Sequence, residues 1–447
     1  LCLSYLTIVF LNATALFIVA RLLLGDTLQV GYSYAVAGHQ VFLAEAMVSV
    51  VSLAIVSLLF LLAKGFLHKL QTLVALVLMA GFIIIGIICV PKAIAAGVLT
   101  SGAIFGTAGL NPVYGIFSLV ILAPWAFVGF DVASFETYRF NFSPSGTKWI
   151  VAIAIIMAAL AYISMTLVGV SAVPDGFSSW SDYVSKIDTL EGVVSVPAFY
   201  GVKKIMGSFG LAVLGITAVA AILTGLMGGY RAIVRILSTM SEDRILSDGF
   251  SKTTNSILFI MVISIVLALL GRNTLNWFVD LTSFGAIVGF GYVSAAAWKI
   301  ARTENNFRVN VTAGIGTVIS VIFVVVQLVP RLAAMEAMGS AAFLLLSLWC
   351  LLGFVFYWST IRRSSLAEYS GMSISGVVLF ALLLYSAIIW VAKILYAKAI
   401  DDSTRDTLVV TGVVLLAIVF IGLVVMLYVQ NQVRKKNELV EREKIRA

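Results

Sequence analysis

Long apolar stretches recur along the whole chain and are separated by short polar loops. Each crossing of the hydrocarbon core of a bilayer by a helix needs about 20 apolar residues. Twelve stretches approach or exceed this length, and the one at 256–271 is the shortest. They lie at residues 1–24, 41–62, 71–90, 114–137, 149–173, 207–237, 256–271, 277–300, 309–330, 340–361, 374–397 and 407–430. The pattern predicts an all-α integral membrane protein with about twelve transmembrane helices.

Composition excludes a soluble protein. The chain has 447 residues, of which 61% are hydrophobic and only 11% are charged. Soluble domains have about 45–50% apolar and about 25% charged residues. The net charge of +8 does not indicate a nucleic-acid partner, because the basic residues concentrate in alternate loops. With a cytoplasmic C-terminus this distribution follows the positive-inside rule, and we expect a multi-pass protein of the cell membrane in that orientation.

One apolar stretch, at 114–138, combines features that a simple lipid-facing helix avoids. It contains Pro124, Gly115 and Gly129, and it carries the ionisable Asp131. Proline removes a backbone donor and clashes with the preceding turn, and a carboxylate in hydrocarbon costs several kcal/mol. Irregular backbone at membrane depth is tolerated only where protein buries it or where it lines a cavity. The stretch therefore predicts an interrupted helix, which is typical of the binding site of a secondary transporter.

No pattern of catalytic or metal-ligating residues is found in the sequence. The three cysteines, Cys2, Cys89 and Cys350, lie in or beside apolar stretches and lack the spacing of metal ligands. No nucleotide-binding loop, zinc motif or Ser/His/Asp arrangement is recognisable. We therefore expect a protein that is not an enzyme and that needs neither a metal nor an organic cofactor.

Four segments together resemble one family of transporters. They are PWAFVGFDVASFE at 124–136, LSYLTIVFLNATALFIVARLL at 3–23, LTGLMGGYRAIVRILSTMSEDRILSDGF at 223–250 and WFVDLTSFGAIVGFGYVSAAAWKIAR at 277–302. They resemble, respectively, the sixth helix, the third helix, the end of the eighth helix with its following loop, and the tenth helix of the amino acid–polyamine–organocation (APC) permeases. The resemblance extends from residue 1 to about residue 302.

This resemblance implies a particular fold and domain organisation. The fold is the leucine-transporter-like bundle of inverted five-helix repeats, in which the broken first and sixth helices meet near the bilayer midplane. Residues 1–302 would form helices 3–10 of the transporter core, 303–430 four accessory transmembrane helices, and 431–447 a basic cytoplasmic tail. About 12 of an expected 14 helices would then be present. The first two would lie upstream, and without them we expect no transport.

The interrupted helix supplies most of the expected substrate-binding residues. Carbonyls of Trp125, Ala126 and Val128 would accept hydrogen bonds from a substrate ammonium group, because backbone groups in a break lose their helical partners. The rings of Trp125 and Phe127 would close or line the site, and Gly129 would lie within the break. The structural alternative is an ordinary proline kink with packed aromatic side chains.

Four further polar residues are candidates, each with a structural alternative. Asp131 is a candidate for proton coupling, or it pairs with a structural cation. Asn12 either faces the substrate cavity or bonds between helices. Tyr230 either closes over the site or packs in the core. Tyr292 lies midway along its helix and could reach the cavity, although helix packing is the safer interpretation for that segment.

The sequence does not decide which ion, if any, is coupled to transport. Thr217 and Thr224 share one helix face and could ligate Na⁺, but bonding back to the preceding turn is the favoured interpretation. Some proton-coupled APC permeases carry a lysine in the fifth helix, whereas residues 71–90 contain no basic residue. Coupling to H⁺ through Asp131, coupling to Na⁺, and exchange without an ion remain alternatives.

Taken together, these features predict a secondary active transporter that moves amino acids or related amines by alternating access. Its partners would be that small-molecule substrate and the lipid bilayer. The alternatives are a transporter-like membrane receptor and a passive channel for small organic cations. A channel would need rings of polar residues along a path, and the sequence offers few. A receptor would be indicated by a large additional soluble domain, and no such domain is recognisable.

Overall fold

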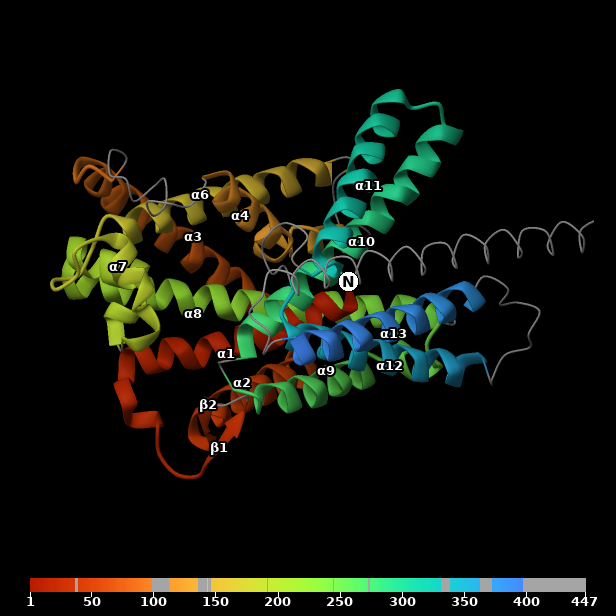
Figure 1. Cartoon of the computed structure of the whole chain (residues 1–447), viewed down its shortest axis with the longest axis horizontal. Coiled ribbons are helices and arrows are strands. Elements are labelled where there is room, and N and C mark those ends of the chain that lie inside the picture. Colours follow the sequence, from red (N-terminus) through yellow and green to blue (C-terminus); the bar gives the residue numbers. More distant parts are fainter. Residues whose placement is uncertain are drawn as a thin grey trace, which may run out of the picture. The chain divides into compact units, whose positions relative to one another are not determined.

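The computed structural model describes residues 1–36, 39–98, 112–135, 143, 146–190, 192–243, 245–271, 274–330, 338–361 and 372–396. Within these ranges the chain is mostly helical, with a single β-hairpin (Figure 1). It divides into two compact units. The first comprises 1–239 and 250–286, and the second comprises 240–249 and 287–447. The boundary between the units lies between residues 286 and 287, inside the helix Leu275–Thr303. The sequence suggested that the transporter core ends later, at residue 302.

Every predicted apolar stretch is helical wherever it is described, although 114–137 is divided between two helices and one short helix, Trp180–Ser185, lies in a polar segment. Their bounds are α1 Cys2–Leu24, α2 Leu43–Leu62, α3 Lys64–Ala95, α4 Pro112–Phe127, α5 Val132–Phe135, α6 Thr147–Val170, α7 Trp180–Ser185, α8 Pro197–Glu242, α9 Thr253–Ala268, α10 Leu275–Thr303, α11 Phe307–Leu328, α12 Ser340–Ile361 and α13 Met372–Tyr396. The predicted stretch at 407–430 and the tail at 431–447 lie outside the described residues.

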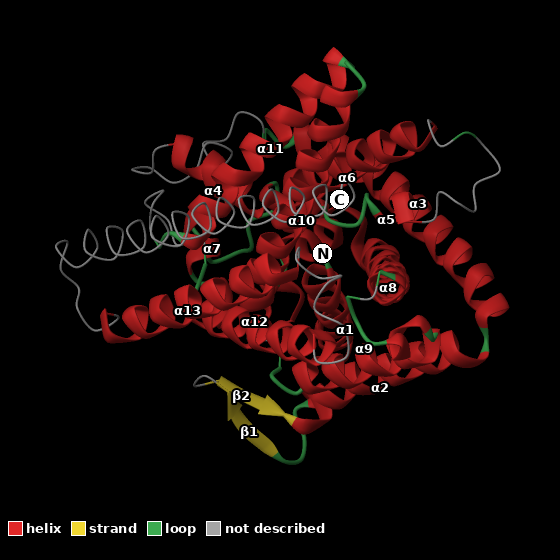
Figure 2. Ribbon diagram, turned by 90° about the vertical axis from the view of Figure 1, so that its right-hand side faces the viewer, coloured by secondary structure: helices red, strands yellow, loops and turns green. Residues whose placement is uncertain are grey.

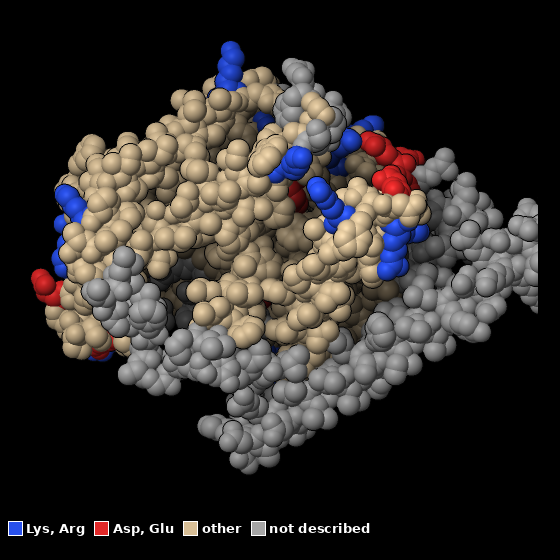
Figure 3. Space-filling model, turned by 90° about the horizontal axis from the view of Figure 1, so that it is seen from above, with Lys and Arg blue, Asp and Glu red and all other residues tan. Residues whose placement is uncertain are grey.

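Nine helical segments of the described chain are long and apolar enough to cross a membrane. Two shorter apolar helical segments, Thr253–Ala268 of α9 and Ser340–Phe356 of α12, accompany them. Large apolar side chains are exposed along α2, α3, α6 and α11, as expected for helices surrounded by lipid rather than water. On the face in Figure 3, uncharged residues cover most of the surface and charged residues form a few small groups. The chain is a helical membrane protein.

The β-hairpin between α1 and α2 was not expected from the sequence. Strands β1 (Ser33–Val36) and β2 (His39–Phe42) are antiparallel, with Ser33 opposite Phe42 (Figure 2). The hairpin is attached to the end of α9, where the Tyr34 hydroxyl donates to the carbonyl of Leu269. Strand residues 41 and 42 explain why α2 begins at Leu43, two residues later than the predicted apolar stretch.

In the first unit, α1 is the central helix. It packs against α2 and α9, and Tyr5, Val9 and Phe10 on it are almost fully buried. A second apolar cluster joins α3, α6 and α8 through residues such as Ile85, Val168 and Val202. Leu22 of α1 packs against this cluster, so the cluster connects α1 with α3, α6 and α8.

Glycines allow α8 to approach its neighbours closely. An ideal Cβ on Gly225 would lie 2.6 Å from Oδ1 of Asn12 in α1, and one on Gly81 in α3 would lie 1.8 Å from Oγ1 of Thr217. On Gly201 the Cβ would lie 2.3 Å from the carbonyl oxygen of Val168 in α6. Small residues at such contacts are typical of helix packing in membranes.

Gly201→Ala is expected to destabilise the first unit, because the methyl group would meet backbone of α6 rather than a movable side chain. Overpacking of this kind costs about 1–2 kcal/mol. Thermal unfolding of the purified protein in detergent would measure the loss. Gly86→Ala in α3 is the matched control, since its Cβ meets nothing within 4 Å. Equal unfolding temperatures for the two variants would contradict this packing.

The polar segment between α6 and α8 contains the short helix α7. Its N-cap, Ser179, accepts a hydrogen bond from the backbone N–H of Asp182. Lys186 donates to the Asp182 carboxylate at 2.7 Å, and the backbone N–H of Ser178 donates to it at 3.2 Å. These bonds favour the ionised form, and together they lower the pKa of Asp182 below its ordinary value of 3.8.

This lowered pKa has a defined consequence for α7. The contribution of ionised Asp182 to stability is fully present above the ordinary pKa of the carboxyl group. It is lost as the pH falls through the lowered pKa. Lys186→Ala, which removes the largest cause of the shift, is expected to raise the pKa of Asp182 toward 3.8. NMR titration of the labelled carboxyl carbon measures this directly. An unchanged pKa in the variant would contradict the assigned cause.

The second unit contains the rest of α10 together with α11, α12 and α13. The α12–α13 pair is joined by Ser347 and Ser386, whose hydroxyls lie 2.8 Å apart. Tyr385 of α13 donates to the carbonyl of Leu328 at the end of α11. Between α10 and α11, Gly291 lies against Ser320 and Gly316 lies against Ser294. These reciprocal contacts hold α10 and α11 together as a close helical pair.

Candidate solute-binding site

The structure divides residues 112–135 into two helices. Helix α4 ends at Phe127, a turn occupies 128–131, and α5 begins at Val132. Pro124 lies inside α4 one turn before the break and has no N–H to donate to the preceding turn. The break therefore follows the proline and coincides with the segment that the sequence singled out.

Gly129 forms the turn itself. Its φ of 115° lies in a region that residues with a Cβ rarely adopt. In a continuous helix its N–H would donate to the carbonyl of Trp125, four residues earlier. Here it donates instead to Oδ1 of Asp131 at 3.2 Å, and Val128 makes a long 3.4 Å bond to Trp125. The helical ladder is thus replaced by a bond from the backbone to a carboxylate.

Asp131 links the break to α1. Its Oδ1 also accepts a hydrogen bond from the Tyr5 hydroxyl at 2.5 Å, and the Tyr5 ring meets that of Phe135 edge-on at 6.1 Å. Among the described residues, no group bonds to the second carboxylate oxygen, Oδ2. Asp131 is half-buried. One oxygen therefore holds the turn in place through its bonds to Tyr5 and Gly129.

Helix α6 contacts the other end of the break. The Tyr162 hydroxyl donates to the carbonyl of Ala126 at 2.7 Å. The rings of Tyr162 and Phe127 meet edge-on with centroids 5.7 Å apart. The last turn of α4 is therefore ordered by a side chain from another helix. The bond from Tyr162 to Ala126 shows that a carbonyl in the last turn of α4 accepts a hydroxyl donor.

Tyr5 and Tyr162 did not stand out in the sequence. Both lie in predicted apolar stretches, where a hydroxyl must find a partner. That requirement indicates that each hydroxyl makes a hydrogen bond to another part of the protein, but the sequence does not say to which residue. Tyr5 is positioned by its neighbours: Ser4 donates to the Thr282 carbonyl of α10, and Thr7 lies 2.6 Å from the Thr282 hydroxyl.

Asn12 and the two threonines make bonds within their own helices. The amide of Asn12 donates to the carbonyl of Ile8 at 2.9 Å, and its side chain lies against Gly225 of α8. The hydroxyls of Thr217 and Thr224 donate to the carbonyls four residues earlier, each at 2.7 Å. The bonds of the two threonines are those that their structural alternative predicts, whereas the alternative for Asn12 was a bond between helices. The roles in substrate and Na⁺ binding stay predictions.

The two other tyrosines of the predicted site lie in different surroundings. Tyr230 is fully buried between α2 and α8, where its hydroxyl is 2.7 Å from that of Ser57 and its ring stacks on Phe60. Tyr292 is 72% exposed and belongs to the second unit. The structure therefore brings together residues 125–131 with Tyr5 and Tyr162, and it gives Tyr230 a packing role.

Within the described residues, no group of three or more His, Cys, Asp or Glu side chains could hold a metal ion. Comparisons of the chain with models of protein families, with curated proteins and with solved structures found no match. The functional interpretation therefore rests on the geometry of the break and on the residues around it.

Proposed function

We propose that this protein is a secondary active transporter for amino acids or related amines, with the architecture of an APC permease. The observation that carries the proposal is the helix break at 128–131, in which Asp131 holds the turn through one oxygen while the second accepts no bond from the described residues. Interrupted helices in membrane proteins are used for solute binding, because lipid cannot satisfy their backbone.

The chemistry of the break suits a positively charged amino group. The C-terminal end of a helix carries partial negative charge, and α4 ends next to the Asp131 carboxylate. Trp125 and Phe127 provide apolar and aromatic surface beside that end. A substrate ammonium would donate to carbonyls of the break and to Oδ2 of Asp131. Binding and release need no covalent step, so we propose a carrier and not an enzyme.

Asp131 is also the group we propose for proton coupling. Protonation of Oδ2 would remove the negative charge and weaken the hold on an ammonium group, so proton binding and substrate binding would oppose each other. Alternating access would expose the break first to one side of the membrane and then to the other. We propose a location in the cell membrane with the C-terminus in the cytoplasm, following the distribution of basic residues.

Uptake by proteoliposomes tests the proposal. The full-length protein is reconstituted and presented with radiolabelled amino acids and polyamines, with an inward H⁺ gradient, an inward Na⁺ gradient or neither. The transporter predicts saturable uptake and counterflow, meaning faster entry of label when unlabelled substrate is inside. Uptake without saturation or counterflow would indicate a channel. Saturable binding to the detergent-solubilised protein without uptake would indicate a receptor.

A further inference from the structure

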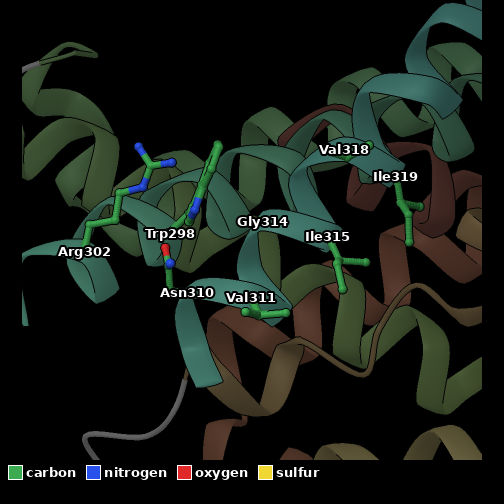
Figure 4. Close-up of a pocket in the computed structure, with 8 residues that line it drawn as sticks. All are labelled: Trp298, Arg302, Asn310, Val311, Gly314, Ile315, Val318 and Ile319. Carbon is green, nitrogen blue, oxygen red and sulfur yellow. The ribbon is translucent and has the colours of Figure 1, made fainter. Parts of the chain in front are cut away.

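A pocket of about 430 Å³ lies between the end of α10 and the start of α11, entirely within the second unit (Figure 4). Its lining combines three polar or aromatic residues with apolar ones from a single helix. The lining residues are Trp298, Arg302, Asn310, Val311, Gly314, Ile315, Val318 and Ile319. This pocket shares no residue with the helix break, and the proposed transport chemistry does not use it.

The polar end of the pocket lies near the linker that joins the two helices. Helix α10 ends at Thr303, α11 begins at Phe307, and the linker at 304–306 is polar. Apolar helices that leave a membrane pass through the layer of lipid headgroups, where Trp, Lys and Arg are enriched. The polar end of the pocket therefore faces the headgroup layer, while the rest of α11 runs into the hydrocarbon.

Arg302 provides a positive charge at the polar end. Its guanidinium lies 4.1 Å from the centre of the Trp298 ring, and it projects alongside the indole in Figure 4. No carboxylate of the described residues pairs with it. The indole in turn lies against Gly314, whose Cβ would be 3.4 Å from the indole nitrogen. The cation is therefore oriented by packing while its charge is left without a counter-ion.

Asn310 adds an unused acceptor beside this charge. Its Oδ1 is buried and has no hydrogen-bond partner in the part of the chain that the structure describes. A buried polar atom without a partner costs about 1–3 kcal/mol, so a ligand with a donor group gains by supplying one. A hydroxyl placed close to a bound phosphate would satisfy this oxygen, and together the two side chains favour a ligand that carries both groups.

The apolar lining forms one continuous face of α11. Val311, Ile315, Val318 and Ile319 are spaced by four, three and one residues, which places them on one side of the helix. All four are exposed. A hydrocarbon chain fits this face, whereas a free phosphate or a soluble sugar phosphate would leave it uncovered.

We propose that this pocket binds one molecule of an anionic glycerophospholipid whose headgroup carries a hydroxyl, such as phosphatidylglycerol. The phosphate contacts Arg302, a headgroup hydroxyl donates to Oδ1 of Asn310, and an acyl chain lies along α11. Basic pockets between transmembrane helices are suited to such headgroups.

Native mass spectrometry of the detergent-purified protein tests the proposal by titration with phosphatidylglycerol or with phosphatidylcholine of the same chains. We expect tighter binding of phosphatidylglycerol, and a weakening of about tenfold in Arg302→Gln, as for loss of one hydrogen bond to a charged group. Lys299→Gln is the matched control, since it removes an equal charge from the same exposed end of α10 without lining the pocket.

Two further arms make the result decisive. Trp298→Leu keeps the charge but removes the surface that orients it, and it is expected to weaken phosphatidylglycerol binding as well. Glycerol 3-phosphate is expected not to compete. Equal affinity for the two lipids, equal weakening by Arg302→Gln and Lys299→Gln, or competition by glycerol 3-phosphate would each overturn the proposal.

Discussion

Asp131→Asn is expected to reduce amino acid uptake by about tenfold or more and to abolish its dependence on external pH between acid and neutral conditions. Asparagine keeps an oxygen that accepts the bonds from Tyr5 and Gly129, so the break should survive. It cannot ionise, and it therefore loses both the charge opposite a substrate ammonium and the group that takes up a proton. Loss of one hydrogen bond to a charged group is worth about 1.5–3 kcal/mol, which corresponds to the stated factor.

Initial rates in proteoliposomes at several pH values measure this effect. Asp182→Asn is the matched control, because it makes the same substitution in α7, outside the membrane-spanning helices. We expect the control to retain the wild-type rate and pH profile. An Asp131→Asn protein whose rate still changes with pH as in the wild type would exclude Asp131 as the proton-coupling group.

Gly129→Ala is expected to lower the free energy of unfolding by about 1–3 kcal/mol and to impair uptake together with stability. No atom lies within 4 Å of the position that its Cβ would take, so the effect does not come from a clash. It comes from the backbone, since a φ of 115° is almost restricted to glycine and strain of this kind costs about 1–3 kcal/mol. The turn must either bear this strain or change its geometry.

Gly115→Ala separates this backbone effect from the general effect of adding a methyl group. Gly115 lies inside α4, also has open space around its Cβ position, and has an ordinary φ. Alanine there should leave the protein unchanged or stabilise it by about 0.5–1 kcal/mol. Thermal unfolding in detergent compares the two variants. Equal unfolding temperatures would show that the turn at 128–131 does not require glycine.

Hydrophobicity was sufficient to predict where most helices lie. Each stretch of apolar residues in the described chain is helical, apart from the break at 128–131, because backbone in lipid must bond within its own segment. The same signal missed the hairpin at 33–42, whose strands are short and whose side chains alternate weakly. It also could not show the helical turns of α8 that precede Gly207, since this polar start looks like loop in the sequence. Gly207, with a φ of 67° and a ψ of −153°, breaks α8 at the residue where the predicted apolar stretch begins.

The candidate site was predictable in part. Pro124, Gly129 and Asp131 marked the interruption, because each opposes a lipid-surrounded helix for a separate physical reason. The partners of the break were not predictable, because they lie far from it in the sequence. Tyr5 is separated from Asp131 by 126 positions, and Tyr162 is separated from Ala126 by 36. The same limit applies to Tyr230, for which the sequence could not distinguish a lid from a packed side chain. In the structure the hydroxyl of Tyr230 bonds with that of Ser57 and its ring stacks on Phe60, as for a packed side chain.

Protection of a single introduced thiol by substrate tests most directly whether the helix break binds a solute. Val128→Cys places a thiol in the turn, in a background where Cys2, Cys89 and Cys350 are replaced by alanine, and Ser185→Cys on the exposed surface of α7 is the control. We predict that a water-soluble thiol reagent labels both proteins, that a transported amino acid or amine slows labelling of the Val128→Cys protein, and that labelling of the Ser185→Cys protein does not respond. A thiol in the turn that stays unlabelled, or whose labelling no amino acid or polyamine slows, would contradict a solute-binding site at this break.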